Sequence, residues 1–261
     1  MELKSVGLNS DLYILSNTSK VIDCGNYLKI ESPNNPEFFW GNFLIFSTPP
    51  QNADYENWIK IFQQEFGHNK GIKHLAFTWD IFGGKPELEK FIVAGFILEE
   101  TVLMSTRELK LMNPNVTLEY RAISSARDWE QLVELQIETG LVELNYNPKI
   151  YREFVQRRFS DYKMMVDKKM GKWFGAFLNG KLVSDLGLFG DHQNMRFQSI
   201  ETKSEYRKQG IAQNLMVYAA SCLKSENYIL QADSKGKAID LYMKMGFEIK
   251  EVISFLHMPS T

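Results

Sequence analysis

The stretch EYRKQGIAQNLM, residues 205–216, joins a basic turn to the start of a helix. A strand, MRFQSIET at 195–202, is expected just before it. After the turn, helical spacing predicts a buried stripe formed by Ile211, Leu215, Tyr218, Ala219 and Cys222. On this stripe Cys222 is expected to be a core thiol rather than a nucleophile.

The start of this helix is a candidate anion site. The first backbone N–H groups of a helix have no partner within it and carry partial positive charge. Gly210 and Ala212 keep side chains away from these groups, and Arg207 and Lys208 add charge for charge-assisted contacts. The stretch therefore predicts a phosphate or pyrophosphate site at a strand–turn–helix junction. The alternative is an ordinary basic turn in which the glycine serves conformation alone.

The residues on either side of the turn alternate between strand and helix patterns. Asp128 is a plausible N-cap with Gln131 at the capping-box position, and Asn179-Gly180 predicts a type I′ hairpin turn. The expected elements are a strand at 115–123, a helix at 128–138, a loop at 138–147, a helix at 148–169, a hairpin at 173–189, a strand at 227–233, a helix at 235–245 and a strand at 247–258.

The first half of the chain repeats part of this order. Two stretches have the same order, the end of a helix followed by Gly-Phe and then a strand: KFIVAGFILEETVLM and YMKMGFEIKEVISFL. This similarity indicates a diverged duplication or a chance match. The expected elements of the first copy are strands at 26–32, 41–47, 72–80 and 96–104 and helices at 55–66 and 86–94. Its connection STPPQNAD, 47–54, has no basic turn and no Gly-x-Gly/Ala, so it cannot do what the second copy's turn does.

Composition excludes several classes. The net charge of the 261 residues is −2, and neither half is a polycation, so we expect no nucleic-acid partner. No apolar run approaches about 18 residues, so we expect no membrane span. Two distant cysteines and an N-terminus without a signal-peptide pattern favour the cytoplasm. The scattered histidines form no cluster at ligand spacing, so no metal is expected.

The element order and two motifs resemble the GNAT superfamily of N-acetyltransferases. The family signature Arg/Gln-x-x-Gly-x-Gly/Ala is matched by Arg207, Gly210 and Ala212. The second signature is matched, in the family's order and spacing, by Ala238, Tyr242, Lys244, Gly246 and Phe247. The resemblance covers about 115–261 and implies an α/β (α+β) fold with a mixed, mostly antiparallel sheet flanked by helices. With the duplication, it implies a truncated GNAT-like domain at 1–112 and an acyl-CoA-binding domain at 113–261.

The resemblance implies that acetyl-CoA is the co-substrate. The pyrophosphate would bind the turn formed by Arg207, Lys208, Gln209, Gly210, Ile211 and Ala212. The pantetheine arm would pair with the strand at 199–202, through Ile200 and Thr202. Tyr242 matches the tyrosine that usually protonates the leaving thiolate, although its place on the helix stripe also suits a core aromatic. One departure is Lys235, which stands where the family often has asparagine.

The general base is less clear. Arg196, Gln198, Ile200 and Thr202 share one face of the expected strand, and none is a credible base. Alternation points Glu201 to the other face, but a bulge, which the family's strand commonly carries, would change that. Glu201 is therefore a candidate catalytic residue, with Asp185 and Glu143 as further candidates.

The predicted function is transfer of an acetyl group to a primary amine of a small molecule or peptide, by a monomer or homodimer. Glu138, Glu143, Tyr146 and Phe189 could contact the acceptor, or could be loop and packing residues. Two alternatives remain open. A domain that lacks a base could be a non-catalytic acetyl-CoA sensor, and the duplication suggests an aminoacyltransferase that uses charged transfer RNA. The intact turn and near-neutral charge argue against the second.

Overall fold

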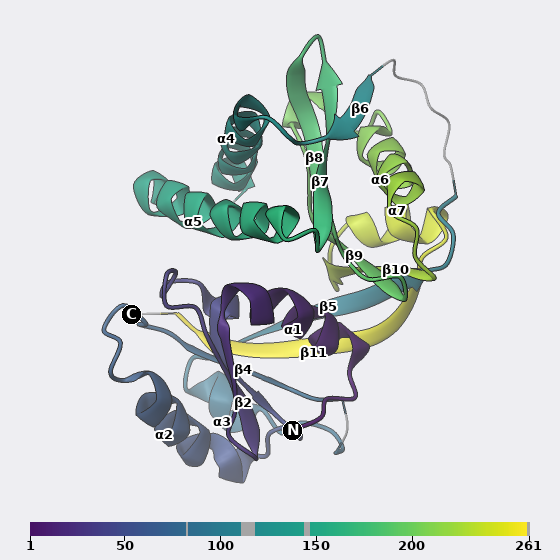
Figure 1. Ribbon diagram of the computed structural model, residues 1–261. Helices are drawn as coiled ribbons and strands as arrows, with labels where there is room; N and C mark the ends of the chain where they lie inside the picture. Colours follow the sequence, from purple (N-terminus) through teal and green to yellow (C-terminus); the bar gives the residue numbers. More distant parts are fainter. Residues whose placement is uncertain (82, 111–117, 144–146, 260–261) are drawn as a thin grey trace. The chain divides into compact units, whose positions relative to one another are not determined.

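The computed structural model describes residues 1–81, 83–110, 118–143 and 147–259, and it divides into two compact units (Figure 1). Unit 1 comprises Met1–Leu103 and Glu251–Thr261, and unit 2 comprises Met104–Lys250. The expected domains, 1–112 and 113–261, rest on the duplication and stay a prediction. The contacts divide the chain elsewhere, because the end of the last strand groups with the first hundred residues.

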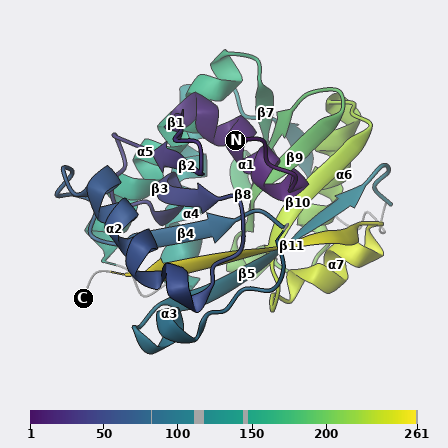
Figure 2. The same ribbon diagram turned by 90° about the horizontal axis from the view of Figure 1, so that it is seen from below.

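Unit 1 is a sheet with helices on both faces. Its elements are α1 (Val6–Thr18), β1 (Lys20–Asp23), β2 (Tyr27–Glu31), β3 (Asn42–Phe46), α2 (Tyr55–Phe66), β4 (Leu75–Trp79), α3 (Glu89–Val93), the first part of β5 (Ile97–Thr106) and most of β11 (Glu248–Met258). Figure 2 shows the strands side by side in the order β1-β2-β3-β4-β11. All neighbouring pairs are antiparallel except β3–β4, which is parallel.

The two faces of this sheet bury different helices. Leu8 and Leu15 of α1 pack with Ile30 and Phe255 on one face. On the other face, Trp58, Phe62 and Phe66 form one stripe of α2 and pack on the sheet. Neither α1 nor β1 was expected from the sequence, whereas α2 has the bounds that its periodicity predicts.

Unit 2 carries the candidate site. Its elements are β6 (Glu119–Ala122), α4 (Ala126–Glu143), α5 (Pro148–Asp167), β7 (Gly171–Leu178), β8 (Lys181–Gly190), β9 (Asn194–Thr202), α6 (Ile211–Cys222), β10 (Asn227–Asp233) and α7 (Ala238–Lys244). The strand order is β10-β9-β8-β7-β6, antiparallel except for the parallel pair β10–β9. In Figure 1, α4 and α5 lie on one side of β7 and β8, and α6 and α7 lie on the other. The mixed, mostly antiparallel sheet flanked by helices is confirmed.

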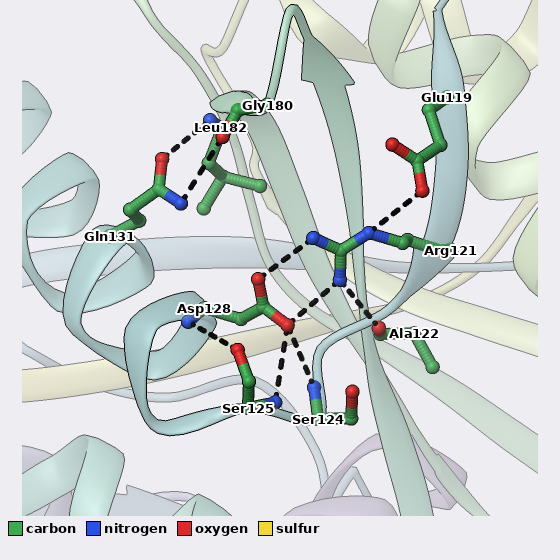
Figure 3. Close-up of polar contacts among 9 residues, drawn as sticks. All are labelled: Glu119, Arg121, Ala122, Ser124, Ser125, Asp128, Gln131, Gly180 and Leu182. Atoms are coloured by element: carbon green, nitrogen blue, oxygen red, sulfur yellow. Dashed lines mark hydrogen bonds and ion pairs between the residues drawn. The ribbon is translucent and has the colours of Figure 1, made fainter.

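The start of α4 differs from the prediction (Figure 3). The N-cap is Ser125 rather than Asp128. The Asp128 N–H donates to Ser125 Oγ, and the Ser125 N–H donates to the Asp128 carboxylate; each donor–acceptor distance is 3.1 Å. This reciprocal pair is a capping box. Arg121 adds two hydrogen bonds of 2.8 Å to the same carboxylate and holds the pKa of Asp128 well below its usual range.

Gln131 ties the same helix to the hairpin instead of capping it. The Leu182 N–H donates to Gln131 Oε1 over 2.9 Å, and Gln131 Nε2 donates to the Gly180 carbonyl oxygen over 3.4 Å (Figure 3). The hairpin turns as predicted, with Asn179 at φ 49° and Gly180 at φ 75°. Two successive positive φ values are what a type I′ turn requires.

Two further expectations are corrected. The expected loop at 138–147 is helical as far as Glu143, since α4 continues through Gly140. At Gly140 a Cβ atom would collide with the Tyr151 hydroxyl of α5. Cys222 is exposed rather than buried. It is the last residue of α6, and the chain leaves the helix in an extended conformation at Leu223, whereas Leu215 in the middle of the helix is fully buried.

Candidate functional site

A hollow of about 380 Å³ opens in unit 2 between the end of β9, the basic turn, the start of α6 and one face of α7. The residues that line it are Ile200, Glu201, Thr202, Tyr206, Arg207, Lys208, Gly210, Ile211, Ala212, Gln213, Ala238, Leu241 and Tyr242. Tyr242, Glu201 and the residues that the resemblance assigns to acetyl-CoA binding all line it except Gln209, whose side chain instead donates to the Glu205 carbonyl oxygen. Tyr206, Gln213 and Leu241 were not singled out from the sequence.

The turn has the backbone conformation of an anion-binding loop. Lys208 and Gly210 both lie in the left-handed region, with φ 61° and 74°, and Gly210 is the N-cap of α6 without a side-chain cap. When residues beside the first turn of a helix adopt the left-handed backbone conformation, successive N–H groups point toward one side. They then form a concave site for an oxyanion. The Arg207 N–H is already used, since it donates to the Ser204 carbonyl oxygen over 3.3 Å. The amides that follow it are therefore the ones that suit a phosphate.

The Arg207 side chain folds back onto β9. Its Nε donates to the Thr202 carbonyl oxygen over 2.9 Å, and its Nη2 lies 3.9 Å from Glu201 Oε2. The guanidinium thus closes the turn and partly neutralises Glu201, while its charge stays at the rim of the hollow. Ser184 fixes the same strand end by donating to the Glu201 carbonyl oxygen over 2.7 Å.

A β-bulge in β9 decides where Glu201 points. Gln198 pairs with Gly187 and Glu201 pairs with Asp185, so three steps on β9 oppose two on β8, and Ser199 takes φ 45°. The extra residue reverses the alternation. Glu201 therefore shares a face with Gln198 and Asp185, whereas a regular strand would place it on the face of Phe197.

Contacts on both faces of β9 agree with this. Tyr162 of α5 donates a 3.4 Å hydrogen bond to Gln198, and its ring packs at a tilt against Trp173, whose Nε1 donates to Asp185. Phe197 instead lies 6.3 Å, centroid to centroid, from Phe247. The condition that the sequence analysis attached to Glu201 is thus met, although its role as a base stays a prediction.

Tyr242 reaches the same hollow from α7. Its side chain is half-buried, and its ring packs edge-on against Phe247 with centroids 6.0 Å apart. Burial, with a smaller contribution from the negative charge of Glu201, raises the pKa of Tyr242 to about 12. The phenol therefore keeps its proton at neutral pH and can donate it inside the hollow.

A comparison with protein families matches residues 169–249 to the acetyltransferase (GNAT) domain. The chain carries a GNAT domain. The match spans the hairpin, the bulged strand, the basic turn and α7, so it includes every residue that lines the hollow. GNAT acetyltransferases use acetyl-CoA. A search of curated proteins finds no relative of this chain.

Solved structures share the fold over nearly the whole chain. A functionally unknown conserved protein from Staphylococcus epidermidis superposes with a TM-score of 0.79 at 17% identity, over 97% of each chain. A GCN5-related N-acetyltransferase from Kribbella flavida has a TM-score of 0.67 at 12% identity, over 99% of this chain and 97% of that one. A tandem GNAT protein from the clavulanic acid biosynthesis pathway has a TM-score of 0.51 at 10% identity, over 79% and 70%. At these identities the likeness concerns the fold alone.

The other candidates that the structure describes do not line the hollow. Phe189 and Asp185 are fully buried, Glu138 is paired with Lys203 over 2.9 Å, and Lys235 is exposed and does not line the hollow. Tyr146 and the side chain of Glu143 lie outside the described residues. Among the residues that the structure describes, no three His, Cys, Asp or Glu side chains gather to hold a metal ion, and no helix is long and apolar enough to cross a membrane.

In unit 1, the helix start that the predicted duplication aligns with the basic turn carries carboxylates instead. Gln51 and Asp54 form a reciprocal capping box on the short 3-10 helix Asn52–Asp54 that leads into α2, and the Asn52 N–H donates to the Glu87 carboxylate at a distance of 3.3 Å. Glu89 accepts from the Asn52 side chain over 2.7 Å. Because carboxylates surround these amides, the start of α2 repels anions, as the missing basic turn predicts.

Proposed function

We propose that the GNAT domain of this chain is an acyl-CoA-dependent N-acyltransferase, which transfers acetyl from acetyl-CoA to a primary amine of a small molecule or a peptide. The observation that supports it is the hollow itself. One cavity joins a basic turn in the left-handed conformation at a helix start, a carboxylate on the bulged strand and a half-buried tyrosine that keeps its proton. These are an anion site, a proton acceptor and a proton donor within one small volume.

Each part has a distinct task in this proposal. The amides of residues 208–212 hold the pyrophosphate, and Arg207 and Lys208 add positive charge beside it. The main chain of Ile200 to Thr202 lies along the hollow, where it can pair with the pantetheine arm. One lone pair of the Thr202 carbonyl oxygen is already engaged, since that oxygen accepts from Arg207.

The proposed reaction includes two proton transfers, one from the amine and one to the leaving sulfur. The thioester supplies an activated acyl carbon; the amine nitrogen bonds to that carbon and the carbon–sulfur bond breaks. Glu201 accepts the proton that the amine loses, directly or through water. Tyr242 donates its proton to the departing sulfur, and burial keeps that proton in place until then.

Calorimetric titration with acetyl-CoA, followed by a primary-amine screen with mass detection, tests the proposal. We expect micromolar binding and an amine product heavier by one acetyl group. Binding with no product from a broad panel would favour a non-catalytic acetyl-CoA sensor. Absence of binding to well-folded protein would overturn the acyl-CoA assignment.

A further inference from the structure

Asp185 is a carboxyl group buried beneath the bulge of β9. Its Oδ1 accepts two hydrogen bonds of 2.9 Å, from Trp173 Nε1 and from Gln136 Nε2. Oδ2 has no hydrogen-bond partner within the described part of the chain, and the side chain is fully buried. An ionised carboxylate in this position would leave a charged oxygen unsolvated, which is costly. Burial accordingly raises the pKa of Asp185 well above its usual value, which favours the neutral acid over the carboxylate.

Gln136 connects this acid to the bulge. Besides its bond to Asp185, its Nε2 donates to the carbonyl oxygen of Ser199 over 3.2 Å. Ser199 is the residue with φ 45°, a conformation that is unfavourable for a non-glycine residue and persists only where its surroundings hold it. One amide of α4 thus bridges a fixed acceptor on β8 and the strained peptide on β9.

We propose that Gln136 and Asp185 are positioning residues that hold the bulge at Ser199 and thereby aim Glu201 into the hollow. The acid fixes the Gln136 amide, the amide fixes the Ser199 carbonyl oxygen, and the bulge sets the face on which Glu201 emerges. Without the bulge, Glu201 would change sides, because each strand residue points opposite to its neighbour. The catalytic part of this inference rests on the proposed function, whereas the structural part does not.

Gln136→Leu is the direct test, and Gln131→Leu is its matched control. Both glutamines lie on α4 and bond to the β7–β9 region, but Gln131 binds the hairpin turn. Amide hydrogen exchange in Gln136→Leu should rise about tenfold at residues 198–202, the scale of one lost hydrogen bond. In Gln131→Leu the rise should be confined to the hairpin turn. Equal exchange at 198–202 in the two variants would overturn the proposal.

Kinetics supply the second readout. In Gln136→Leu, kcat for acetyl transfer should fall about 10- to 100-fold, the scale of a misplaced catalytic group, while the dissociation constant for CoA changes less than about twofold. Equal loss of kcat in Gln131→Leu would show a general packing effect and sink the assignment. If the wild-type protein transfers no acetyl group, the proposed function fails alone, and hydrogen exchange still decides the positioning role.

Asp185 gives an independent pair of variants should Gln136→Leu not fold. Asp185→Asn keeps the oxygen that accepts from Trp173 and Gln136, so exchange at 198–202 and kcat should stay within about threefold of wild type. Asp185→Leu removes that acceptor and should reproduce the tenfold rise in exchange. Wild-type exchange in Asp185→Leu would contradict the proposal.

Discussion

Arg207 Nε donates a hydrogen bond of 2.9 Å to the carbonyl oxygen of Thr202, and this bond ties the first residue of the basic turn to the last residue of β9. The guanidinium therefore has two effects on the hollow. It places positive charge at the helix start, and it fixes the path by which the chain leaves the bulged strand. Removing it should affect both the anion and the carboxylate Glu201, 3.9 Å away.

Arg207→Ala should weaken acetyl-CoA binding about tenfold or more, the scale of a lost charge-assisted contact. Arg207→Lys should recover part of this loss, because it keeps the charge but lacks the Nε that reaches Thr202. Titration calorimetry with acetyl-CoA and 3′-dephospho-CoA checks the origin of the effect. Both ligands should lose affinity by the same factor, and a loss restricted to the ligand with the 3′-phosphate would contradict a pyrophosphate site.

Tyr242→Phe should lower kcat by about 100-fold and leave the acetyl-CoA dissociation constant nearly unchanged, since only the proton donor is lost. The pKa of Tyr242, about 12 in the folded protein, predicts a second effect. Because it lies above the unfolded value of about 10, Tyr242 stabilises the fold below pH 10, and this contribution is lost as the pH rises toward 12. Urea unfolding at pH 8 and pH 11 should show a smaller alkaline loss of stability in Tyr242→Phe. Unchanged kcat would remove Tyr242 from the mechanism.

Gly210→Ala should destabilise the protein by about 1 kcal/mol, because its φ of 74° disfavours a side chain. Gly180→Ala is a matched control, with φ 75° in the hairpin turn and open space around its Cβ position. The two variants should lose similar stability in thermal unfolding, but only Gly210→Ala should lose affinity for acetyl-CoA. Equal affinities would mean that the ligand does not approach this backbone.

Asp128→Asn should destabilise the protein by about 2 kcal/mol at pH 7, through weaker bonds to Arg121 and a weaker capping box. The pKa of Asp128 is depressed chiefly by Arg121, so its contribution is present above pH 4 and is lost as the pH falls below the unfolded value of about 3.9. Urea unfolding should therefore show the difference from wild type shrinking between pH 7 and pH 3. Glu119→Gln, which alters the exposed partner of Arg121, should cost less than about 1 kcal/mol.

The parts of the site that are adjacent in sequence were predictable. The turn at 205–212, the type I′ hairpin at Asn179-Gly180 and the helix that carries Tyr242 follow from glycine placement, turn chemistry and local periodicity. Local rules decide such features because the residues that make the contacts are neighbours in the chain. The family resemblance supplied the role of Tyr242, which the helix stripe alone left open.

The parts that depend on distant contacts were not predictable. Gln136 and Asp185 are 49 residues apart, and they lie on different elements from Ser199. No local pattern around Gln136 or Asp185 predicts that the Gln136 amide binds the carbonyl oxygen of Ser199, a serine with positive φ. The face of Glu201 depended on that bulge. Gly140 is unfavourable inside a helix, and the close approach of Tyr151 explains why a residue without a side chain stands there.

The capping of α1 has a consequence for how the protein is made. Glu251 accepts hydrogen bonds from Ser5 Oγ and from the N–H groups of Val6 and Gly7, so the start of α1 is capped by a residue up to 246 positions later in the chain. At about 5–20 residues per second, roughly 10 to 50 s of synthesis separate the two. Unit 2 is contiguous in sequence and can fold within that interval. During this time unit 1 lacks the strand end that completes it.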